Sequence, residues 1–135
     1  MTGVLVDTCV WSMALRGSSA KEATITSKLT QLIDDNQVKI IGPIKQELLS
    51  GYSDKASYDK LRNKLKYFPN EAVLDSDYEC GAEYSNICRA KGIQGYHTDF
   101  LICAVAVRLK LKIFTVNKDF ERYRKHLLVT LLEQS

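Results

Sequence analysis

The stretch that decides the fold runs from His97 to Phe120 and reads His-Thr-Asp-Phe-Leu-Ile-Cys-Ala-Val-Ala-Val-Arg-Leu-Lys-Leu-Lys-Ile-Phe-Thr-Val-Asn-Lys-Asp-Phe. From Phe100 to Val107 no residue is charged or strongly polar, which is typical of a helix buried on all sides. Ile113–Val116 is short and continuously apolar, as expected of a buried parallel strand. Asp99 begins the helix and Asp119 follows the strand. The stretch therefore predicts a buried helix–strand unit flanked by two carboxylates.

Length and composition indicate one globular domain. A chain of 135 residues can form one hydrophobic core, and a charged fraction of 26% is ordinary. The net charge of +3 permits a nucleic-acid partner without requiring one. The 4 cysteines include no Cys-x-x-Cys pair, and with only 2 histidines a structural zinc site is not expected. We expect free thiols in a reducing cytosol, no signal peptide and no membrane span. Residues 1–135 are therefore predicted to form a single cytoplasmic domain.

Apolar runs and helical spacings alternate along the chain. Strands are predicted at Val4–Val6, Val38–Ile41, Ala72–Leu74 and Ile113–Val116, with a final edge strand at Leu127–Leu132. Helices are predicted at Cys9–Arg16, Lys21–Asn36, from Pro43 onward, Asp54–Phe68, Ser76–Lys91, from Asp99 onward and from Asn117 to Lys125. The predicted caps are Thr8, a Ser76–Glu79 capping box and Asn117. This alternation predicts an α/β fold, a three-layer α/β/α sandwich with a central, mostly parallel sheet of four to five strands.

Four acids are predicted to meet at one edge of this sheet. Asp7 ends the first strand, Glu47 lies one helical turn beyond the second, and Asp99 and Asp119 flank the last helix–strand unit. Because sites in parallel sheets form beyond the carboxyl ends of the strands, we expect one cleft. Converging carboxylates repel unless they share a cation, and oxygen ligands favour Mg²⁺ or Mn²⁺. Such an ion activates water and stabilises charge on a phosphoryl oxygen, which suits phosphodiester hydrolysis.

Each acid also has a purely structural interpretation. Asp99 and Asp119 could cap helices, and Glu47 could lie on a solvated helix face. Asp7 is the hardest to explain in this way, because acids are depleted from apolar strands. Other polar side chains at the same edge are interpreted as a supporting layer that orients carboxylates or waters, with strand-end turns as the alternative: Thr8, Thr115 and Asn117.

Four motifs, in this order, resemble the PIN domain family, and within it the VapC-type ribonuclease toxins of toxin–antitoxin modules. The motifs are Val-Leu-Val-Asp-Thr at 4–8, Glu-Leu-Leu-Ser-Gly at 47–51, Thr-Asp-Phe-Leu-Ile-Cys-Ala at 98–104 and Thr-Val-Asn-Lys-Asp-Phe at 115–120. Together they span nearly the whole chain. Two positions depart from the pattern: Asn117 stands where many relatives carry an aspartate, and Cys9 replaces the usual serine.

The resemblance implies a PIN-like fold and an endoribonuclease that depends on Mg²⁺ or Mn²⁺. It implies an RNA substrate, a homodimer and a VapB-type antitoxin whose tail occupies the cleft. Asp7, Glu47, Asp99 and Asp119 map onto the acidic quartet of the family, and Asn117 is the alternative to Asp119 as the fourth ligand. Hydrolysis of this kind would leave 5′-phosphate and 3′-hydroxyl ends.

Two other classes of function remain open from the residues. One is phosphoryl transfer through an aspartyl-phosphate on Asp7. Its usual motif is Asp-x-Asp-x-Thr, and Cys9 occupies the place of the second aspartate. The other is a non-catalytic module that binds RNA or a protein partner. The presence of all four acids favours the nuclease over both.

Overall fold

A four-stranded parallel sheet lies at the centre of the computed structural model, which describes residues 3–17 and 19–133. Its strands are β1 (Val4–Val6), β2 (Val38–Ile41), β3 (Asn70–Glu71) and β4 (Lys112–Phe114), in the order β3-β2-β1-β4. Leu5 of β1 lies opposite Lys39 on one side and Ile113 on the other. The predicted α/β fold with a mostly parallel sheet is confirmed. The predicted domain also includes residues 1, 2, 18, 134 and 135, which lie outside the described residues.

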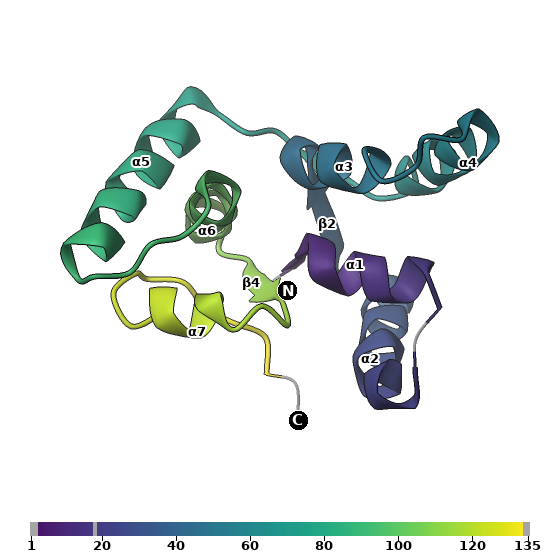
Figure 1. Ribbon diagram of the computed structural model, residues 1–135, viewed down its shortest axis with the longest axis horizontal. Coiled ribbons are helices and arrows are strands. Elements are labelled where there is room, and N and C mark those ends of the chain that lie inside the picture. Colours follow the sequence, from purple (N-terminus) through teal and green to yellow (C-terminus); the bar gives the residue numbers. More distant parts are fainter. Residues whose placement is uncertain (1–2, 18, 134–135) are drawn as a thin grey trace.

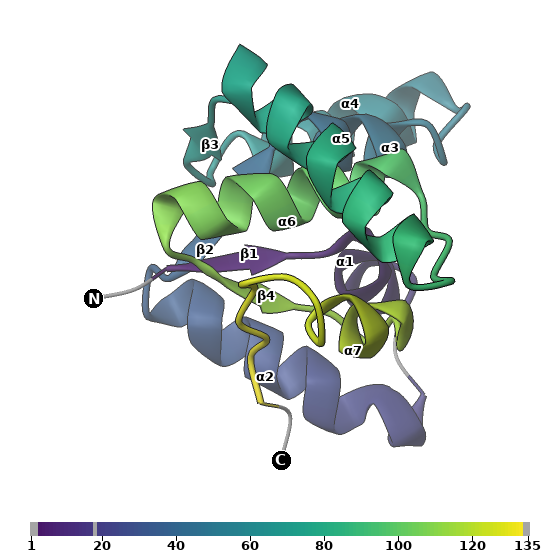
Figure 2. The same ribbon diagram turned by 90° about the vertical axis from the view of Figure 1, so that its left-hand side faces the viewer.

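Helices cover both faces of this sheet (Figures 1 and 2). In Figure 2, α6 lies on one face with α5 packed outside it, and α2 lies on the other face. Over the described residues, none of the helices is both long and apolar enough to cross a lipid bilayer. The helices are α1 (Thr8–Leu15), the 3₁₀ turn η1 (Ala20–Glu22), α2 (Ala23–Asp34), α3 (Gly42–Leu49), α4 (Lys55–Leu65), α5 (Asp75–Ala90), α6 (His97–Leu109) and α7 (Asp119–Tyr123).

The α6 helix is the core helix that its sequence predicts. Every side chain from Asp99 to Ala106 is buried, because the sheet contacts one side of the helix and α5 covers the other. The helix ends at Leu109, and its C-cap, Lys110, has a left-handed backbone (φ 56°) that turns the chain toward β4. The Leu111 amide donates back to the Ala106 carbonyl at 2.8 Å. The buried helix–strand unit is thereby confirmed, with the strand placed at Lys112–Phe114 instead of Ile113–Val116.

Two further predicted strands are also wrong in position or extent. The third is Asn70–Glu71 and not Ala72–Leu74, because pairing with Ile40 and Ile41 depends on backbone groups at a sheet edge and not on apolar side chains. The predicted edge strand Leu127–Leu132 is reduced, among the described residues, to a single bridge between Ile113 and Leu131. Two hydrogen bonds form that bridge: the Ile113 amide donates to the Thr130 carbonyl, and the Leu132 amide donates to the Ile113 carbonyl.

Two predicted helix starts are also wrong. Asp7, and not Thr8, caps α1, because its carboxylate accepts the Thr8 amide at 2.8 Å while the Thr8 hydroxyl is used elsewhere. Helix α5 begins at Asp75, and the side chain that reaches back to its start is Asp77, which accepts the Leu74 amide at 2.8 Å. The predicted Ser76–Glu79 pair is thus replaced by Leu74 and Asp77, two positions earlier in the chain. The helix predicted at Lys21–Asn36 is divided into η1 and α2.

Candidate active site

The order of the strands places a crevice between the ends of β1 and β4. The chain proceeds from β1 to β2 and β3 on one side of the sheet and then crosses to β4 on the other side of β1. Such a reversal leaves a gap between connections at the carboxyl ends of the two strands, where ligands bind in parallel sheets. The Asp7 amide donates to the Phe114 carbonyl at 2.9 Å, which ties the two strand ends together at this point.

Asp7 is held rigidly at the end of β1. It is 6% exposed. Its Oδ1 accepts the Thr8 amide at 2.8 Å, and its Oδ2 accepts the Thr115 hydroxyl at 2.8 Å and the Cys9 thiol at 3.5 Å. Burial, followed by the charge of Asp7, raises the pKa of the Cys9 thiol, so Cys9 acts here as a neutral donor. The orientation of the first carboxylate is therefore fixed from both β1 and β4.

The segment after β4 forms a relay of polar contacts that ends at Asp119. The Thr115 hydroxyl accepts the Asn117 amide at 3.0 Å, and the Asn117 Oδ1 accepts the Asp119 amide at 3.0 Å. The N-cap position of α7 is Lys118, so the cap predicted at Asn117 is one residue too early, although the Asn117 side chain still accepts the first amide of the helix. The helix ends at Tyr123 and not at Lys125. With its side-chain oxygen used in this way, Asn117 positions Asp119 and leaves that residue to present the carboxylate.

Glu47 joins the crevice from α3. The Thr8 hydroxyl donates to its Oε1 at 2.8 Å, which links the glutamate to the start of α1 and so to the neighbour of Asp7. Glu47 is otherwise exposed. The sequence also allowed Glu47 to lie on a solvated helix face. That alternative accounts for the exposure of its side chain but not for its hydrogen bond with Thr8.

Asp99 is the third residue of α6 and is 8% exposed. Its Oδ2 accepts the Tyr123 hydroxyl at 2.8 Å, so the carboxylate contacts α7 across the crevice and does not cap its own helix. Burial raises the pKa of Asp99 to about 6, and the negative charges of Asp7, Asp119 and Glu47 add to that increase against the Tyr123 hydrogen bond. Asp99 therefore lies close enough to the other three acids for their charge to affect its pKa.

Asp119 is the most loosely held of the four. Its side chain is 38% exposed and lies 3.7 Å from Nη1 of Arg122, one turn later on α7. The long distance and the solvent around the pair make this a weak ion pair. Its backbone is fixed by Asn117, but its carboxylate retains freedom to move toward the other acids.

Sequence reasoning missed Tyr123. The residue is 0% exposed, and burial and the charge of Asp99 raise its pKa well above the usual value, so its hydroxyl remains a donor. A usable signal was present: Tyr123 lies four residues after Asp119, and residues at this spacing share one face of a helix.

The four acids offer the kind of oxygen donors that a divalent cation binds. Among the described residues, no three His, Cys, Asp or Glu side chains are already close enough to hold a metal ion. The donors are nevertheless all carboxylate oxygens, which Mg²⁺ and Mn²⁺ prefer. Their mutual repulsion, seen in the raised pKa of Asp99, is the kind that a shared cation relieves. The donor set therefore fits such an ion.

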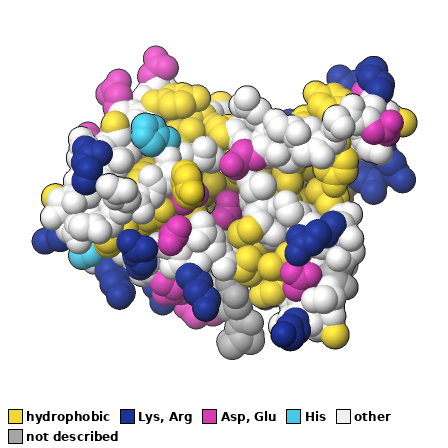
Figure 3. Space-filling view, in the orientation of Figure 1, with side chains coloured by type: hydrophobic (Ala, Val, Ile, Leu, Met, Phe, Trp, Pro, Cys, Tyr) yellow, Lys and Arg dark blue, Asp and Glu magenta, His cyan; other side chains and the backbone are white. Residues whose placement is uncertain are grey.

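The charge pattern of the surface agrees with this location. Figure 3 views the molecule from the carboxyl ends of the strands, and acidic side chains lie near the centre of that face. Lys and Arg side chains lie mostly toward its edges, with one group over α4 at the upper right. An acidic centre with basic side chains around it can hold a cation and still face a polyanion.

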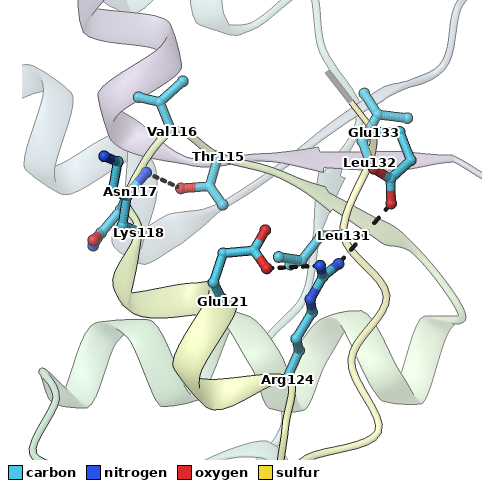
Figure 4. A pocket seen from close by; sticks show the side chains of 9 residues that line it. All are labelled: Thr115, Val116, Asn117, Lys118, Glu121, Arg124, Leu131, Leu132 and Glu133. Carbon is cyan, nitrogen blue, oxygen red and sulfur yellow. Dashed lines mark hydrogen bonds and ion pairs between the residues drawn. The ribbon is translucent and has the colours of Figure 1, made fainter. Parts of the chain in front are cut away.

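A cavity of about 550 Å³ adjoins the site between α7 and the C-terminal segment (Figure 4). Thr115 and Asn117 line it, but none of the four acids does. Its arginine, Arg124, already pairs with Glu121 at 2.7 Å and approaches Glu133 at 4.0 Å. The cavity therefore lies beside the carboxylates and offers no comparable set of reactive groups.

Comparison with known proteins supplies a family and a set of related folds. The PIN domain family model matches residues 4–126. FitAcB from Neisseria gonorrhoeae has a similar structure at 19% identity, with a TM-score of 0.76 and 97% of each chain covered. VapBC2 from Rickettsia felis, bound to a DNA fragment from its promoter, is similar at 18% identity, with a TM-score of 0.75 and 98% of each chain covered. A toxin–antitoxin complex from Klebsiella pneumoniae matches at 18% identity and a TM-score of 0.70, covering 87% of this chain and 90% of that one. No curated protein sequence gives a significant match.

Proposed function

The chain belongs to the PIN domain family, and from this membership and its acidic crevice we propose that it is a metal-dependent endoribonuclease. The observation that carries the proposal is the approach of three other carboxylates to the buried Asp99 at the reversal point of the sheet, where three helices and the end of β1 contribute the four acids. Residues 1–135 would form the single nuclease domain.

Each acid has a proposed role that follows from how it is held. Asp7 and Asp99, the two buried acids, would bind Mg²⁺ or Mn²⁺ most directly, and Glu47 and Asp119 would complete the site. When bound, the ion lowers the pKa of water and offsets charge on the scissile phosphate. Thr8, Thr115 and Asn117 would orient these carboxylates through the hydrogen bonds described above. The products would carry 5′-phosphate and 3′-hydroxyl ends.

RNA is the proposed substrate, and exposed cations support it. Helix α4 presents several exposed basic side chains, which would contact phosphates away from the reacting bond: Lys60, Arg62 and Lys64. Neutralising phosphates in this way supplies affinity that does not depend on base sequence.

The aspartyl-phosphate alternative is disfavoured by the contacts of Asp7. Both of its oxygens accept hydrogen bonds, from Thr8 on one side and from Thr115 and Cys9 on the other. An aspartyl-phosphate would convert one of these oxygens into an ester oxygen and weaken the hydrogen bonds that tie β1 to β4, whereas a cation can bind a remaining lone pair and leave those hydrogen bonds in place.

We further propose that the protein is the toxin of a type II toxin–antitoxin system, acting in the cytoplasm as a homodimer that a VapB-type antitoxin inhibits. The folds it resembles include one described as a toxin–antitoxin complex, which supports this role. Helix α5 and the residue before it expose large apolar side chains that would suit protein contacts: Leu74, Tyr78 and Ile87.

The test is RNA cleavage by the purified chain with Mn²⁺, Mg²⁺ or excess EDTA. Wild type should cleave structured RNA only with metal, and Asp7→Asn should lower the rate by at least about a hundredfold, as expected for a lost metal ligand. Asp34→Asn is the matched control, because it removes the same charge from an exposed position on α2. Equal cleavage by wild type and Asp7→Asn would refute the proposal.

A further inference from the structure

A tyrosine that the family motifs do not include contacts one of the four acids directly. The Tyr123 hydroxyl donates to Oδ2 of Asp99 at 2.8 Å. Among the hydrogen bonds of the described residues, this is the one that the Asp99 carboxylate accepts. We propose that Tyr123 is the positioning residue of the metal site, and that Gly95 is required because only glycine leaves room for its hydroxyl. This inference rests on the proposed metal-dependent nuclease function.

The ring of Tyr123 is locked in place. It is 0% exposed and lies between two phenylalanines. Its centroid is 4.8 Å from that of Phe100, the residue after Asp99, and 5.2 Å from that of Phe120, the residue after Asp119. The same aromatic cluster therefore joins the helices that carry two of the acids. A hydroxyl on a ring held this way can fix a carboxylate, because neither partner can rotate away.

Gly95 lies against this hydroxyl in the loop before α6. A Cβ at position 95 would overlap the Tyr123 hydroxyl oxygen, and would stand 2.7 Å from Cζ of that ring and 2.9 Å from Cζ of Phe100. Gly95 is not one of the two positive-φ glycines, Gly17 and Gly92, so space and not backbone conformation requires it. Because the ring is wedged between Phe100 and Phe120, it cannot yield without pulling the hydroxyl from Asp99.

Substitutions at positions 95 and 123, which are far apart in sequence but in contact in the structure, should therefore both weaken metal binding. Tyr123→Phe removes the donor and keeps the ring, and Gly95→Ala keeps the donor and displaces it. Loss of a group that orients a ligand typically weakens metal binding by about ten- to a hundredfold. If both act through one hydroxyl, the double variant should bind metal no more than about twofold worse than Gly95→Ala alone, because the second change removes nothing further.

The experiment is a Mn²⁺ titration of the full chain, with free Mn²⁺ measured by electron paramagnetic resonance. Two variants are matched controls. Gly42→Ala adds a methyl group where no described atom lies within 4 Å. Tyr84→Phe removes a half-buried phenol hydroxyl that contacts Cys80 on α5. Both should bind Mn²⁺ as wild type does. A second readout is the Mn²⁺ concentration that gives half-maximal RNA cleavage, which should rise in Tyr123→Phe by about the same factor as the dissociation constant and stay unchanged in the two controls.

Three results would overturn the inference. The first is Mn²⁺ affinity in Tyr123→Phe within about twofold of wild type. The second is additive losses in the double variant, which would mean that Gly95 and Tyr123 act separately. The third is equal weakening by the Tyr84→Phe control. A wild type that binds no Mn²⁺ would overturn the proposed function and this inference together, whereas a wild type that binds it and a Tyr123→Phe that binds it equally would overturn the inference alone.

Discussion

Asp99→Asn should stabilise the metal-free protein at neutral pH, although Asp99 is a proposed metal ligand. The folded chain raises the pKa of this carboxyl from 3.8 to about 6, chiefly through burial. A carboxyl with a higher pKa in the folded state binds more protons when folded, so the free energy of unfolding falls as the pH rises through that window. Above about pH 6 the folded protein bears the full cost of the buried charge.

The magnitude follows from the two pKa values. A difference of about two pKa units corresponds to about 3 kcal/mol, at about 1.4 kcal/mol for each. Asparagine removes the charge and keeps an oxygen that can accept the Tyr123 hydroxyl. Its amide group also needs a partner in the same place, so we expect a net gain of about 1–2 kcal/mol.

Urea denaturation with excess EDTA measures this gain, with the fluorescence of the only tryptophan as the signal. Trp11 is 4% exposed and packs on Phe68 with ring centroids 5.0 Å apart, so unfolding changes its surroundings. The gain should be present at about pH 7.5 and largely lost at about pH 3, below the unfolded-state pKa of 3.8, where the carboxyl is mostly protonated in both states. The prediction would be refuted if the Asp99→Asn variant were less stable than wild type at about pH 7.5. It would also be refuted if the gain in the free energy of unfolding did not depend on pH.

Three further substitutions test the supporting contacts. Asp77→Asn should lower the free energy of unfolding by about 2–4 kcal/mol in urea denaturation, because it breaks a 2.8 Å pair between a carboxylate that is 3% exposed and Arg108; a loss below about 1 kcal/mol would contradict this. Thr115→Val should weaken Mn²⁺ binding about tenfold in the same titration, since it removes the donor to Asp7; unchanged affinity would show that Asp7 needs no such support. Asn117→Ala should cost about 1 kcal/mol in thermal unfolding through loss of its hydrogen bond to the first amide of α7, whereas Asn117→Asp keeps an acceptor and should cost little; equal losses would show that this hydrogen bond does not contribute.

The sequence predicts the fold well where side-chain burial determines it. The apolar run from Phe100 to Val107 identifies α6, because a helix covered on both sides leaves no place for a polar side chain. The apolar pattern does not predict the strand Asn70–Glu71, since its two residues are polar and join the sheet through backbone pairing with β2. The apolar Leu127–Leu132 segment gives the opposite error: it packs on the core but pairs with β4 at one bridge.

The candidate site shows the same division. Topology alone brings the four acids to one edge, because Asp7, Glu47 and Asp119 follow strands and Asp99 lies in the first turn of the helix that leads back to β4. The supporting role of Thr8, Thr115 and Asn117 is predicted from their place at this edge, but the acid that each one contacts is not, since that depends on side-chain directions. Its sequence position predicts that Thr8 caps a helix, whereas in the structure its hydroxyl donates a hydrogen bond to Glu47.

The pairing of β1 with β4 also sets the order in which the protein can become active during synthesis. Thr115 and Asp7 are 108 residues apart, and their hydrogen bond is part of the crevice. At about 5–20 residues per second, a ribosome needs roughly 5–20 s to make the intervening chain. Until β4 emerges, the carboxyl end of β1 has only β2 beside it, and the Asp7 carboxylate lacks its donor from Thr115. A nascent chain of this protein therefore cannot complete its acidic crevice while most of it is still being translated.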